Sequence, residues 1–262
     1  MKDTKRRALG QHFLRDPRTA RAIVDLVAPG PRDLVVEIGP GEGALTAELE
    51  RRAGRVIALE IDPALAARLR TRFPGVEVLE ADARRWSYRS LPRPSGGRVV
   101  VVGNLPYSVA KPILQSLVQA RTAIDEMALM LQREVADRVA APPGGRTYGS
   151  LSVLTQLYCE ARVALHVPPG AFRPPPRVES AVVHLRVLPT PRVAVSDEPR
   201  FSSVVRAAFA HRRKTLANAL AGSLGMAPGA VRAAADATGI DPGRRAETLT
   251  IPEFAALSAR LI

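Results

Sequence analysis

Hydrophobic and polar positions follow two alternating patterns along most of this chain. Short apolar runs, as long as strands buried on both faces, are separated by longer segments with apolar residues at helical spacing. The strands predicted by this pattern span residues 33–38, 55–60, 76–79, 99–102, 126–132, 159–167 and 178–187. Strands that alternate with helices predict an α/β fold, and here a doubly wound, mostly parallel sheet of the Rossmann-like type.

Capping residues indicate where several of the intervening helices begin. Asp16 as N-cap and Pro17 at the first helical position predict a helix to about Val27, and Asp62 with Pro63 marks the start of another. Further helices are expected over residues 111–119 and 133–140 and from about residue 148.

The composition changes near residue 189. Beyond it alanine, leucine and arginine dominate, and no further strand signal is present. Helices are expected there over residues 201–210, 212–221, 228–238 and 252–261. We therefore expect two domains: residues 1–188 form the α/β domain with a flexible basic arm at its start, and residues 189–262 form a small all-helical domain.

One strand tip carries residues suited to binding an amine. A run of four valines leads into Asn104-Leu105-Pro106-Tyr107. Asn104 offers a side-chain carbonyl acceptor, and Pro106 favours an extended Leu105 whose backbone carbonyl can turn outward. Two acceptors that converge suit an exocyclic amine with two N–H donors, and the ring of Tyr107 can stack on a base such as adenine. The alternative is an ordinary strand-to-helix turn, in which Asn and Pro are common.

A glycine-rich turn, Gly39–Gly43, follows the first strand. Glycines let the backbone pass close to a ligand, and the next helix points free N–H groups toward it. The third glycine of the dinucleotide fingerprint is absent, because Leu45 and Thr46 stand there. The turn, with Gly39 and Gly41 as candidate contacts, therefore favours a cofactor whose amino-acid end and ribose pass it over a pyrophosphate.

Acidic residues follow the next two strands. Glu60 ends the second strand about twenty positions after Gly39, where such folds bind ribose hydroxyls. Asp62 is expected to cap a helix instead. Asp82 follows the third strand and could accept a hydrogen bond from an adenine amino group; the alternative is an ordinary loop carboxylate. Because these tips all lie at the carboxyl ends of parallel strands, we expect them to line one crevice.

The charge balance points to a polyanionic partner. The formal net charge is +13, and no basic amphipathic segment with Trp or Phe on its apolar face is present, so nucleic acid is favoured over a membrane surface. An arginine-rich proteome is the alternative source of this charge. Cys159 is the single cysteine, which excludes an internal disulfide or cysteine zinc site, and no metal is expected. Without a membrane-length apolar run or signal peptide, we expect a soluble, cytoplasmic protein.

A second candidate surface lies in the expected helical domain. His211, Arg212, Arg213 and Lys214 follow one another there, and such a group of cationic side chains could contact phosphates. The alternative is a solvated helix face. Because the expected crevice could stack a base, we take Arg212, Arg213 and Lys214 as candidate RNA contacts.

Six motifs, in their order along the chain, resemble those of the ribosomal RNA adenine N6-dimethyltransferases. They are Gly-Gln-His-Phe-Leu at 10–14, Glu-Ile-Gly-Pro-Gly at 37–41, Asn-Leu-Pro-Tyr at 104–107, Tyr-Gly-x-Leu-Ser-Val at 148–153, Phe-x-Pro-Pro-Pro-Arg-Val-Glu-Ser-Ala-Val-Val at 172–183 and Phe-x-x-Arg-Arg-Lys-Thr-Leu at 209–216. These enzymes are class I methyltransferases that use S-adenosyl-L-methionine. The last motif favours the KsgA branch, which modifies two neighbouring adenines in a hairpin near the 3′ end of small-subunit RNA.

The resemblance also implies roles for particular residues. In this family the N-terminal segment folds over the cofactor, which makes His12 and Leu14 candidate cofactor contacts. The aromatic residue of the Pro-rich connector, Phe172 here, packs against the target adenine opposite Tyr107. Two positions depart from the family pattern: Ser108 follows the motif tyrosine where Asn is usual, and His12 stands where Asn is common. Neither departure touches the proposed amine acceptors.

The expected function is transfer of methyl groups to N6 of two adjacent adenines in small-subunit (16S) ribosomal RNA during ribosome biogenesis, by a protein that acts as a monomer. One alternative is an Erm-type enzyme, which methylates large-subunit RNA and confers macrolide resistance. Another is a non-catalytic RNA-binding assembly or transcription factor on the same fold, and a third is amine methylation on DNA or protein. Intact cofactor tips, with both Glu60 and Asn104 present, favour the enzyme.

Overall fold

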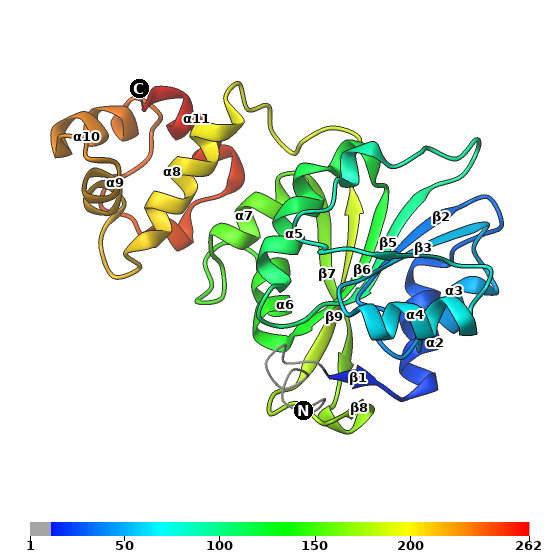
Figure 1. Cartoon of the computed structure of the whole chain (residues 1–262). Coiled ribbons are helices and arrows are strands. Elements are labelled where there is room, and N and C mark those ends of the chain that lie inside the picture. Colours follow the sequence, from blue (N-terminus) through cyan, green and yellow to red (C-terminus); the bar gives the residue numbers. More distant parts are fainter. Residues whose placement is uncertain (1–11, 262) are drawn as a thin grey trace. The chain divides into compact units, whose positions relative to one another are not determined.

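The computed structural model describes residues 12–261, which divide into two compact units (Figure 1). The first contains the chain as far as Ala136 together with Glu160–Val187, and the second contains Asp137–Cys159 together with the chain from Leu188. The C-terminal helices thus share their unit with residues 137–159, which the composition alone assigns to the α/β domain. The basic arm expected at the start of the chain lies outside the described residues.

The first unit holds a sheet of seven strands in the order β4-β3-β2-β5-β6-β9-β7. The strands are β2 (Leu34–Ile38), β3 (Arg55–Glu60), β4 (Glu77–Glu80), β5 (Val99–Asn104), β6 (Glu126–Gln132), β7 (Cys159–Val167) and β9 (Ser180–Val187). Neighbouring strands from β4 to β6 are parallel, whereas β9 runs antiparallel to β6. The predicted mostly parallel sheet is confirmed, and the predicted strands agree with these bounds to within two residues.

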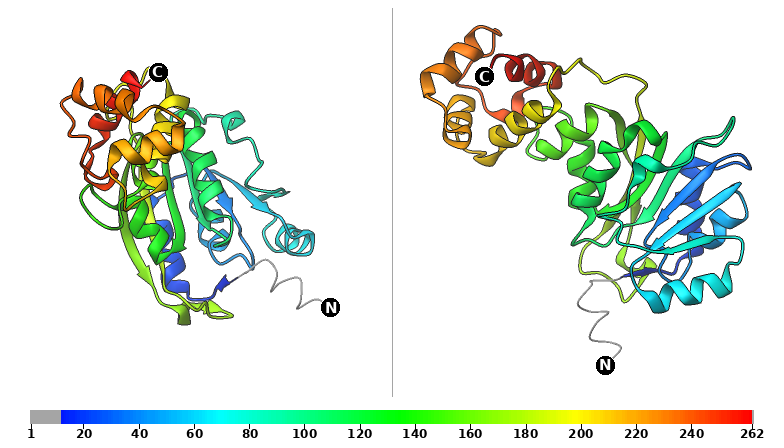
Figure 2. Two further views of the ribbon diagram at one scale, coloured as in Figure 1. Left: turned by 90° about the vertical axis from the view of Figure 1, so that its left-hand side faces the viewer. Right: turned by 45° about the horizontal axis from the view of Figure 1, so that its top comes forward.

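Helices cover both faces of this sheet. On one face α2 (Pro17–Val27), α3 (Thr46–Glu50) and α4 (Pro63–Arg72) contribute their apolar side chains to a single hydrophobic cluster with the strands. Helix α5 (Ala110–Gln119) lies on the other face (Figure 2). Because both faces are covered, the valines of β5 are fully buried, as their unbroken apolar run predicts.

The predicted helix starts are confirmed by their caps. The carboxylate of Asp16 accepts hydrogen bonds of 3.2 Å from the backbone N–H groups of Arg18 and Thr19 at the start of α2. Asp62 caps α4 in the same way, with Pro63 at the first helical position. The carboxylate of Asp62 is therefore engaged by its own helix, as expected.

A short pair of strands was not visible as a pattern in the sequence. β1 (Phe13–Leu14) pairs antiparallel with β8 (Phe172–Arg173), and the N–H of Arg15 donates to the carbonyl of Ala171 at 2.8 Å. A two-residue strand is too short to show a period, so it leaves no hydrophobic signature. We call residues 12–14 the strap, because this pairing fastens them to the Pro-rich connector before β9.

The second unit is helical in its C-terminal part. It contains the second half of α6 (Arg133–Ala140), followed by α7 (Ser150–Gln156), α8 (Glu198–Ala210), α9 (Leu216–Leu224), α10 (Pro228–Asp236) and α11 (Ile251–Arg260). The predicted start of α9 at residue 212 is wrong. Residues 211–214 form a turn instead, closed by a 2.9 Å bond from the N–H of Lys214 to the carbonyl of His211. None of the helices within residues 12–261 is long and apolar enough to cross a membrane.

Aromatic packing explains why residues 137–159 group with the C-terminal helices. The ring of Tyr148 lies edge-on to that of Phe209, with ring centres 5.8 Å apart, and Phe209 in turn packs 5.7 Å from Phe254. Each such aromatic pair stabilises the unit by about 0.5–1.5 kcal/mol beyond the area that it buries. The segment before α7 therefore belongs to the core of the helical unit.

Candidate active site

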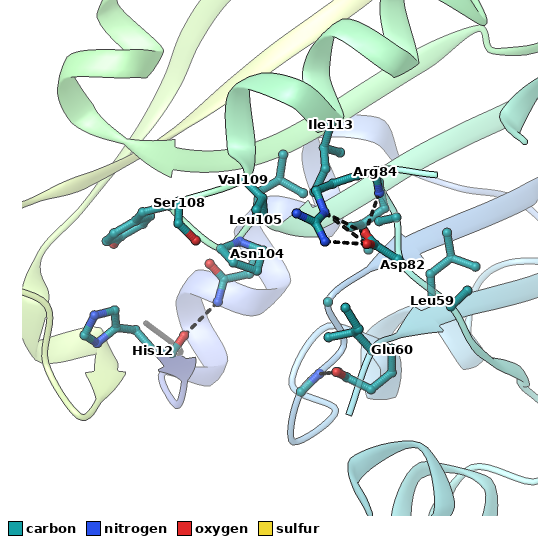
Figure 3. A pocket seen from close by; sticks show the side chains of 18 of the residues that line it. His12, Leu59, Glu60, Asp82, Arg84, Asn104, Leu105, Ser108, Val109 and Ile113 are labelled. Carbon is teal, nitrogen blue, oxygen red and sulfur yellow. Dashed lines mark hydrogen bonds and ion pairs between the residues drawn. The ribbon is translucent and has the colours of Figure 1, made fainter. Parts of the chain in front are cut away.

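A cavity of about 300 Å³ opens at the carboxyl edge of the sheet in the first unit (Figure 3). Its walls come from the strap, from the ends of β2, β3 and β5, from the loop after β4 and from the start of α5. Most of the candidate site residues line it: His12, Gly39, Gly41, Glu60, Asp82, Asn104, Leu105, Pro106 and Tyr107. The expectation of one shared crevice therefore agrees with the geometry.

The side chain of Asn104 is held in one orientation. Its amide nitrogen donates a 2.9 Å hydrogen bond to the backbone carbonyl of His12 in the strap. Because the nitrogen faces this carbonyl, the amide oxygen is left to face the cavity, as Figure 3 shows. The neighbouring Leu105 is anchored by its own N–H, which donates to the carbonyl of Met130 at 3.1 Å. The strap thus fixes which atom Asn104 presents to a ligand.

Tyr107 is anchored at its hydroxyl. Its oxygen lies 2.6 Å from Oγ of Ser180 at the start of β9, and burial raises the pKa of the phenol, which therefore stays neutral. The ring of His12 lies beside it, with ring centres 5.7 Å apart and planes tilted by 33°. Nδ1 of His12 lies 2.8 Å from the carbonyl oxygen of Pro174, which can only accept, so Nδ1 carries the proton. These contacts hold both rings in place at the cavity wall.

Glu60 binds the backbone of the glycine turn with its carboxylate. One carboxylate oxygen accepts from the N–H of Gly41 at 3.1 Å and the other from the N–H of Asp62 at 2.9 Å. Burial raises the pKa of Glu60, and the bonds from the backbone partly oppose this shift. Each oxygen accepts only one of these bonds and so has a further lone pair, and because Glu60 lines the cavity, its carboxylate suits the hydroxyl donors of a ribose.

A second carboxyl group, Glu37, lies at the end of β2 behind this turn. It is fully buried, and within the described residues neither of its oxygens has a hydrogen-bond partner. Burial raises its pKa to about 8, and repulsion from Glu60 adds to the shift. The hydroxyl of Thr46 lies near enough to oppose the shift but outside hydrogen-bond geometry. Glu37 is therefore protonated at neutral pH, and the sequence reading did not single it out.

The glycine turn requires its glycines. Gly39, Gly41 and Gly43 all have positive φ, which only glycine adopts without strain. A Cβ on Gly41 would also lie 2.8 Å from the ring of Phe13 in the strap, and one on Gly39 would lie 3.0 Å from the carbonyl of Asn104. The strap and the tip of β5 therefore both rest directly on this turn.

The loop after β4 places an arginine inside the cavity. Arg84 follows Asp82 by two positions, and its guanidinium donates hydrogen bonds to both carboxylate oxygens of Asp82. Hydrogen bonding from Arg84 lowers the pKa of Asp82, so the carboxylate is charged. Asp82 lies where the sequence predicted, but its two oxygens are already engaged.

Leu14 and Phe172 are placed differently from the other candidates. They are cross-strand partners in the β1–β8 pair, and each is only 5% exposed. Both side chains belong to the hydrophobic cluster of the sheet and not to the lining of the cavity. The expectation that Phe172 faces Tyr107 across a base does not agree with this placement, because β-pairing with the strap turns its ring into the core.

The cationic group of the second unit lies in the turn between α8 and α9. The guanidinium of Arg212 contacts the backbone carbonyl of Arg146 and lies 3.1 Å from the carboxylate of Glu247. Arg212 thereby links this turn to the loop before α7. The side chains of Arg213 and Lys214 are exposed. Nothing in this arrangement corresponds to a helix face.

Comparisons with known proteins agree with the motifs. The sequence profile of the ribosomal RNA adenine dimethylase family matches residues 2–262. The ribosomal RNA small subunit methyltransferase A of Geobacter metallireducens is 44% identical over 98% of this chain and 95% of its own length, and that of Moorella thermoacetica is 46% identical over 98% and 92%.

This chain belongs to the ribosomal RNA adenine dimethylase family. The resemblance drawn from the six motifs is thereby confirmed. Among solved structures, a dimethyladenosine transferase from Plasmodium falciparum matches with a TM-score of 0.77 at 25% identity, over 94% of this chain and 96% of its own. The 23S rRNA methyltransferase ErmE matches with a TM-score of 0.71 at 29% identity, over 95% and 99%. The dimethylase fold therefore extends over both units.

Several structural features in and around the cavity of this dimethylase family member were not predicted from the sequence. They include the ring of Phe13 on the glycine turn, the exposed side chain of Ile61, the Ser180 contact to Tyr107, and Arg84. Ile61 is 45% exposed although apolar, and it follows directly after Glu60 in the cavity wall. That position, one step beyond a strand-terminal carboxylate, is a signal that could have identified it.

Proposed function

We propose that this protein transfers methyl groups from S-adenosyl-L-methionine to N6 of two adjacent adenines in a 3′-terminal hairpin of small-subunit (16S) ribosomal RNA, which gives N6,N6-dimethyladenosine during ribosome biogenesis. The observation that carries the proposal is the orientation of Asn104, whose amide oxygen faces the cavity beside Leu105. Identities of 44–46% to small-subunit methyltransferases support this substrate over the large-subunit RNA named for ErmE, which is 29% identical.

The cavity offers groups that fit each part of the cofactor. Glu60 would accept from the ribose hydroxyls, and the backbone of Gly39 and Gly41 would pass the amino-acid end. The apolar side chain of Ile61 would cover the adenine ring, whose amino group would donate to Asp82. His12 would contact the cofactor from the strap, while Leu14 acts through packing beneath it. The bound cofactor supplies an activated methyl group on its sulfonium.

The residues at the tip of β5 would act on the target amine. Its lone pair is delocalised into the adenine ring, which makes it a poor nucleophile. Hydrogen bonds from its two N–H groups to Oδ1 of Asn104 and to the carbonyl of Leu105 favour a pyramidal nitrogen with its lone pair aimed at the methyl carbon. Pro106 favours an extended backbone at Leu105, which lets the carbonyl of Leu105 point outward. The ring of Tyr107 would stack on the base.

Proton transfer needs no dedicated residue in this scheme. The nitrogen would form its bond to the methyl carbon as the bond from that carbon to the sulfonium sulfur breaks, so the positive charge would pass from sulfur to nitrogen. The nitrogen would then lose a proton to solvent. After the first transfer one N–H remains, so the pocket must hold the monomethylated amine in a rotated position for the second. Arg213 and Lys214 would contact RNA phosphates, with Arg212 bracing the turn that carries them.

The substrate can be tested directly. The protein is incubated with radiolabelled S-adenosyl-L-methionine and, separately, with immature small-subunit particles, large-subunit RNA and DNA. We expect label on two adjacent adenines of the small-subunit RNA only. Label in large-subunit RNA would favour the Erm-type activity, and binding of small-subunit particles without label would favour a non-catalytic assembly factor. We also propose that the enzyme acts as a monomer in the cytoplasm, which sedimentation with its RNA substrate and cell fractionation would test.

A further inference from the structure

The guanidinium of Arg84 binds the carboxylate of Asp82, which is also the candidate acceptor for the amino group of an adenine. Its Nε lies 2.9 Å and 3.0 Å from the two oxygens of Asp82, and Nη2 lies 2.5 Å from Oδ2. Both side chains line the same cavity as Glu60 and Asn104, and Figure 3 shows the contacts between them. Together with the backbone N–H of Arg84, the guanidinium brings two donor atoms to each oxygen of Asp82, so the acceptor sites of the carboxylate are already in use.

The two partners differ in how firmly they are held. The carboxylate of Asp82 also accepts a hydrogen bond from the backbone N–H of Arg84 at 2.9 Å. The backbone carbonyl of Asp82 accepts from the N–H groups of Arg85 and Trp86. This turn fixes Asp82. The side chain of Arg84 is 45% exposed and can rotate into solvent. Arg84 is thus the partner that moves when the pair is broken.

We propose that Arg84 competes with the adenine amino group of the cofactor for Asp82, so that the guanidinium must leave before the adenine can dock. The inference rests on the proposed function, because it assumes an adenine-containing cofactor in this cavity. An exposed ion pair contributes little free energy, and the competition therefore weakens cofactor binding without preventing it. Arg84 tunes the affinity of the site and its preference for a 6-amino purine.

The preference for the amino group follows from the donors and acceptors involved. A 6-amino purine donates to the carboxylate of Asp82 and gains nothing from a guanidinium at the same place. A 6-oxo purine presents an acceptor there, which Arg84 can satisfy by donating. Removing Arg84 should therefore help the amino ligand and harm the oxo ligand.

Titration calorimetry with S-adenosylhomocysteine tests the competition. We expect Arg84→Ala to bind this ligand about two- to fivefold more tightly than the wild type at low salt. The gain should shrink as the salt concentration rises, because salt already weakens the exposed pair in the wild type. Arg85→Ala is the matched control, since Arg85 is the neighbouring exposed cation outside the cavity, and its affinity should stay within about 1.5-fold. Equal or weaker binding by Arg84→Ala, with unfolding temperature unchanged, would overturn the proposal.

S-inosylhomocysteine supplies the second measurement. We expect the ratio of its dissociation constant to that of S-adenosylhomocysteine to rise in Arg84→Ala and to stay constant in Arg85→Ala. An unchanged ratio in Arg84→Ala would also contradict the competition. If the wild type bound neither ligand, the proposed function itself would fail, which separates the two failures.

Discussion

The two edges of the central sheet use the same kinds of side chain in opposite ways. At the amino edge, where β2, β5 and β6 begin, Arg98 donates to the carboxylates of Asp33 and Glu126 at 2.8 Å and 2.7 Å. His184 adds a 2.6 Å contact to Glu126, so each charge there has a partner. At the carboxyl edge Glu37 has no hydrogen-bond partner within the described residues, and Asn104 keeps an oxygen free for the cavity.

The pKa directions follow this difference. Burial pushes the pKa of Asp33 up, but the hydrogen bonds from Arg98 and Gly30 outweigh it and lower the pKa. Burial of Glu37 is opposed only by Thr46, which does not outweigh it, and its pKa rises to about 8. Polar groups that satisfy one another stabilise the fold, whereas the free amide oxygen of Asn104 at the cavity is available to a ligand. The comparison predicts that substitutions at the amino edge change stability, whereas substitutions of the cavity residues at the carboxyl edge change function.

The largest effect is expected from Asn104→Ala. Removing the oxygen that accepts from the target amine should lower methyl transfer by about 10²- to 10³-fold, while S-adenosylhomocysteine still binds with an affinity close to that of the wild type. Single-turnover assays and calorimetry measure the two quantities. Asn104→Asp keeps an acceptor but places a carboxylate oxygen against the carbonyl of His12, so it should also lose activity. Wild-type turnover in either variant contradicts the role of Asn104.

At the amino edge, Arg98→Ala should destabilise the protein by about 2 kcal/mol, because it removes the guanidinium that two largely buried carboxylates share. The methyl transfer rate per folded molecule should not change. Arg93→Ala is the matched control, since Arg93 pairs only at the surface with Asp125 and should cost well under about 1 kcal/mol. Denaturant unfolding measures the free energy of unfolding of both variants. Equal losses of this free energy would show that the network around Arg98 stabilises the protein no more than a surface ion pair does.

Glu37→Gln tests the unpaired carboxyl through pH. The native pKa of about 8 lies above the ordinary value of 4.5, so between these values the native state holds a proton that the unfolded chain has released. Stability therefore falls as pH rises through this window, at up to about 1.4 kcal/mol per pH unit, and is unaffected by this group below it. The variant should flatten the dependence of the unfolding free energy on pH between 5 and 8. An identical slope in both proteins would show that Glu37 is ionised in the native state.

The smallest effect is expected in the helical unit. Replacing Arg213 and Lys214 together by Ala should weaken binding to small-subunit RNA by a few fold and reduce the slope of log affinity against log salt by about 1.5. Arg232→Ala, an exposed cation on α10 of the same unit, should leave both unchanged. Filter binding over a salt series makes the measurement. An equal loss for Arg232 would indicate that the unit attracts RNA through its net charge alone.

Sequence patterns were sufficient for the elements and for the choice of strand tips. Period and capping located the seven strands and the start of α2, because buried runs and N-caps are local properties. The same reasoning brought Glu60, Asp82 and Asn104 to one edge, since parallel strands all end on the same side. It failed for α9, where Arg212 takes partners in a turn that are distant in sequence.

What the sequence determined by itself was the fold, the family and most of the candidate residues that line the cavity. What only the tertiary structure decided was which atom each of them presents: the oxygen of Asn104, turned outward by the strap, and the carboxylate of Asp82, covered by Arg84. It also decided that Phe172 lies in the core. Periodicity and capping act over a few residues, whereas a hydrogen bond between residues 12 and 104 depends on the position of the whole chain between them.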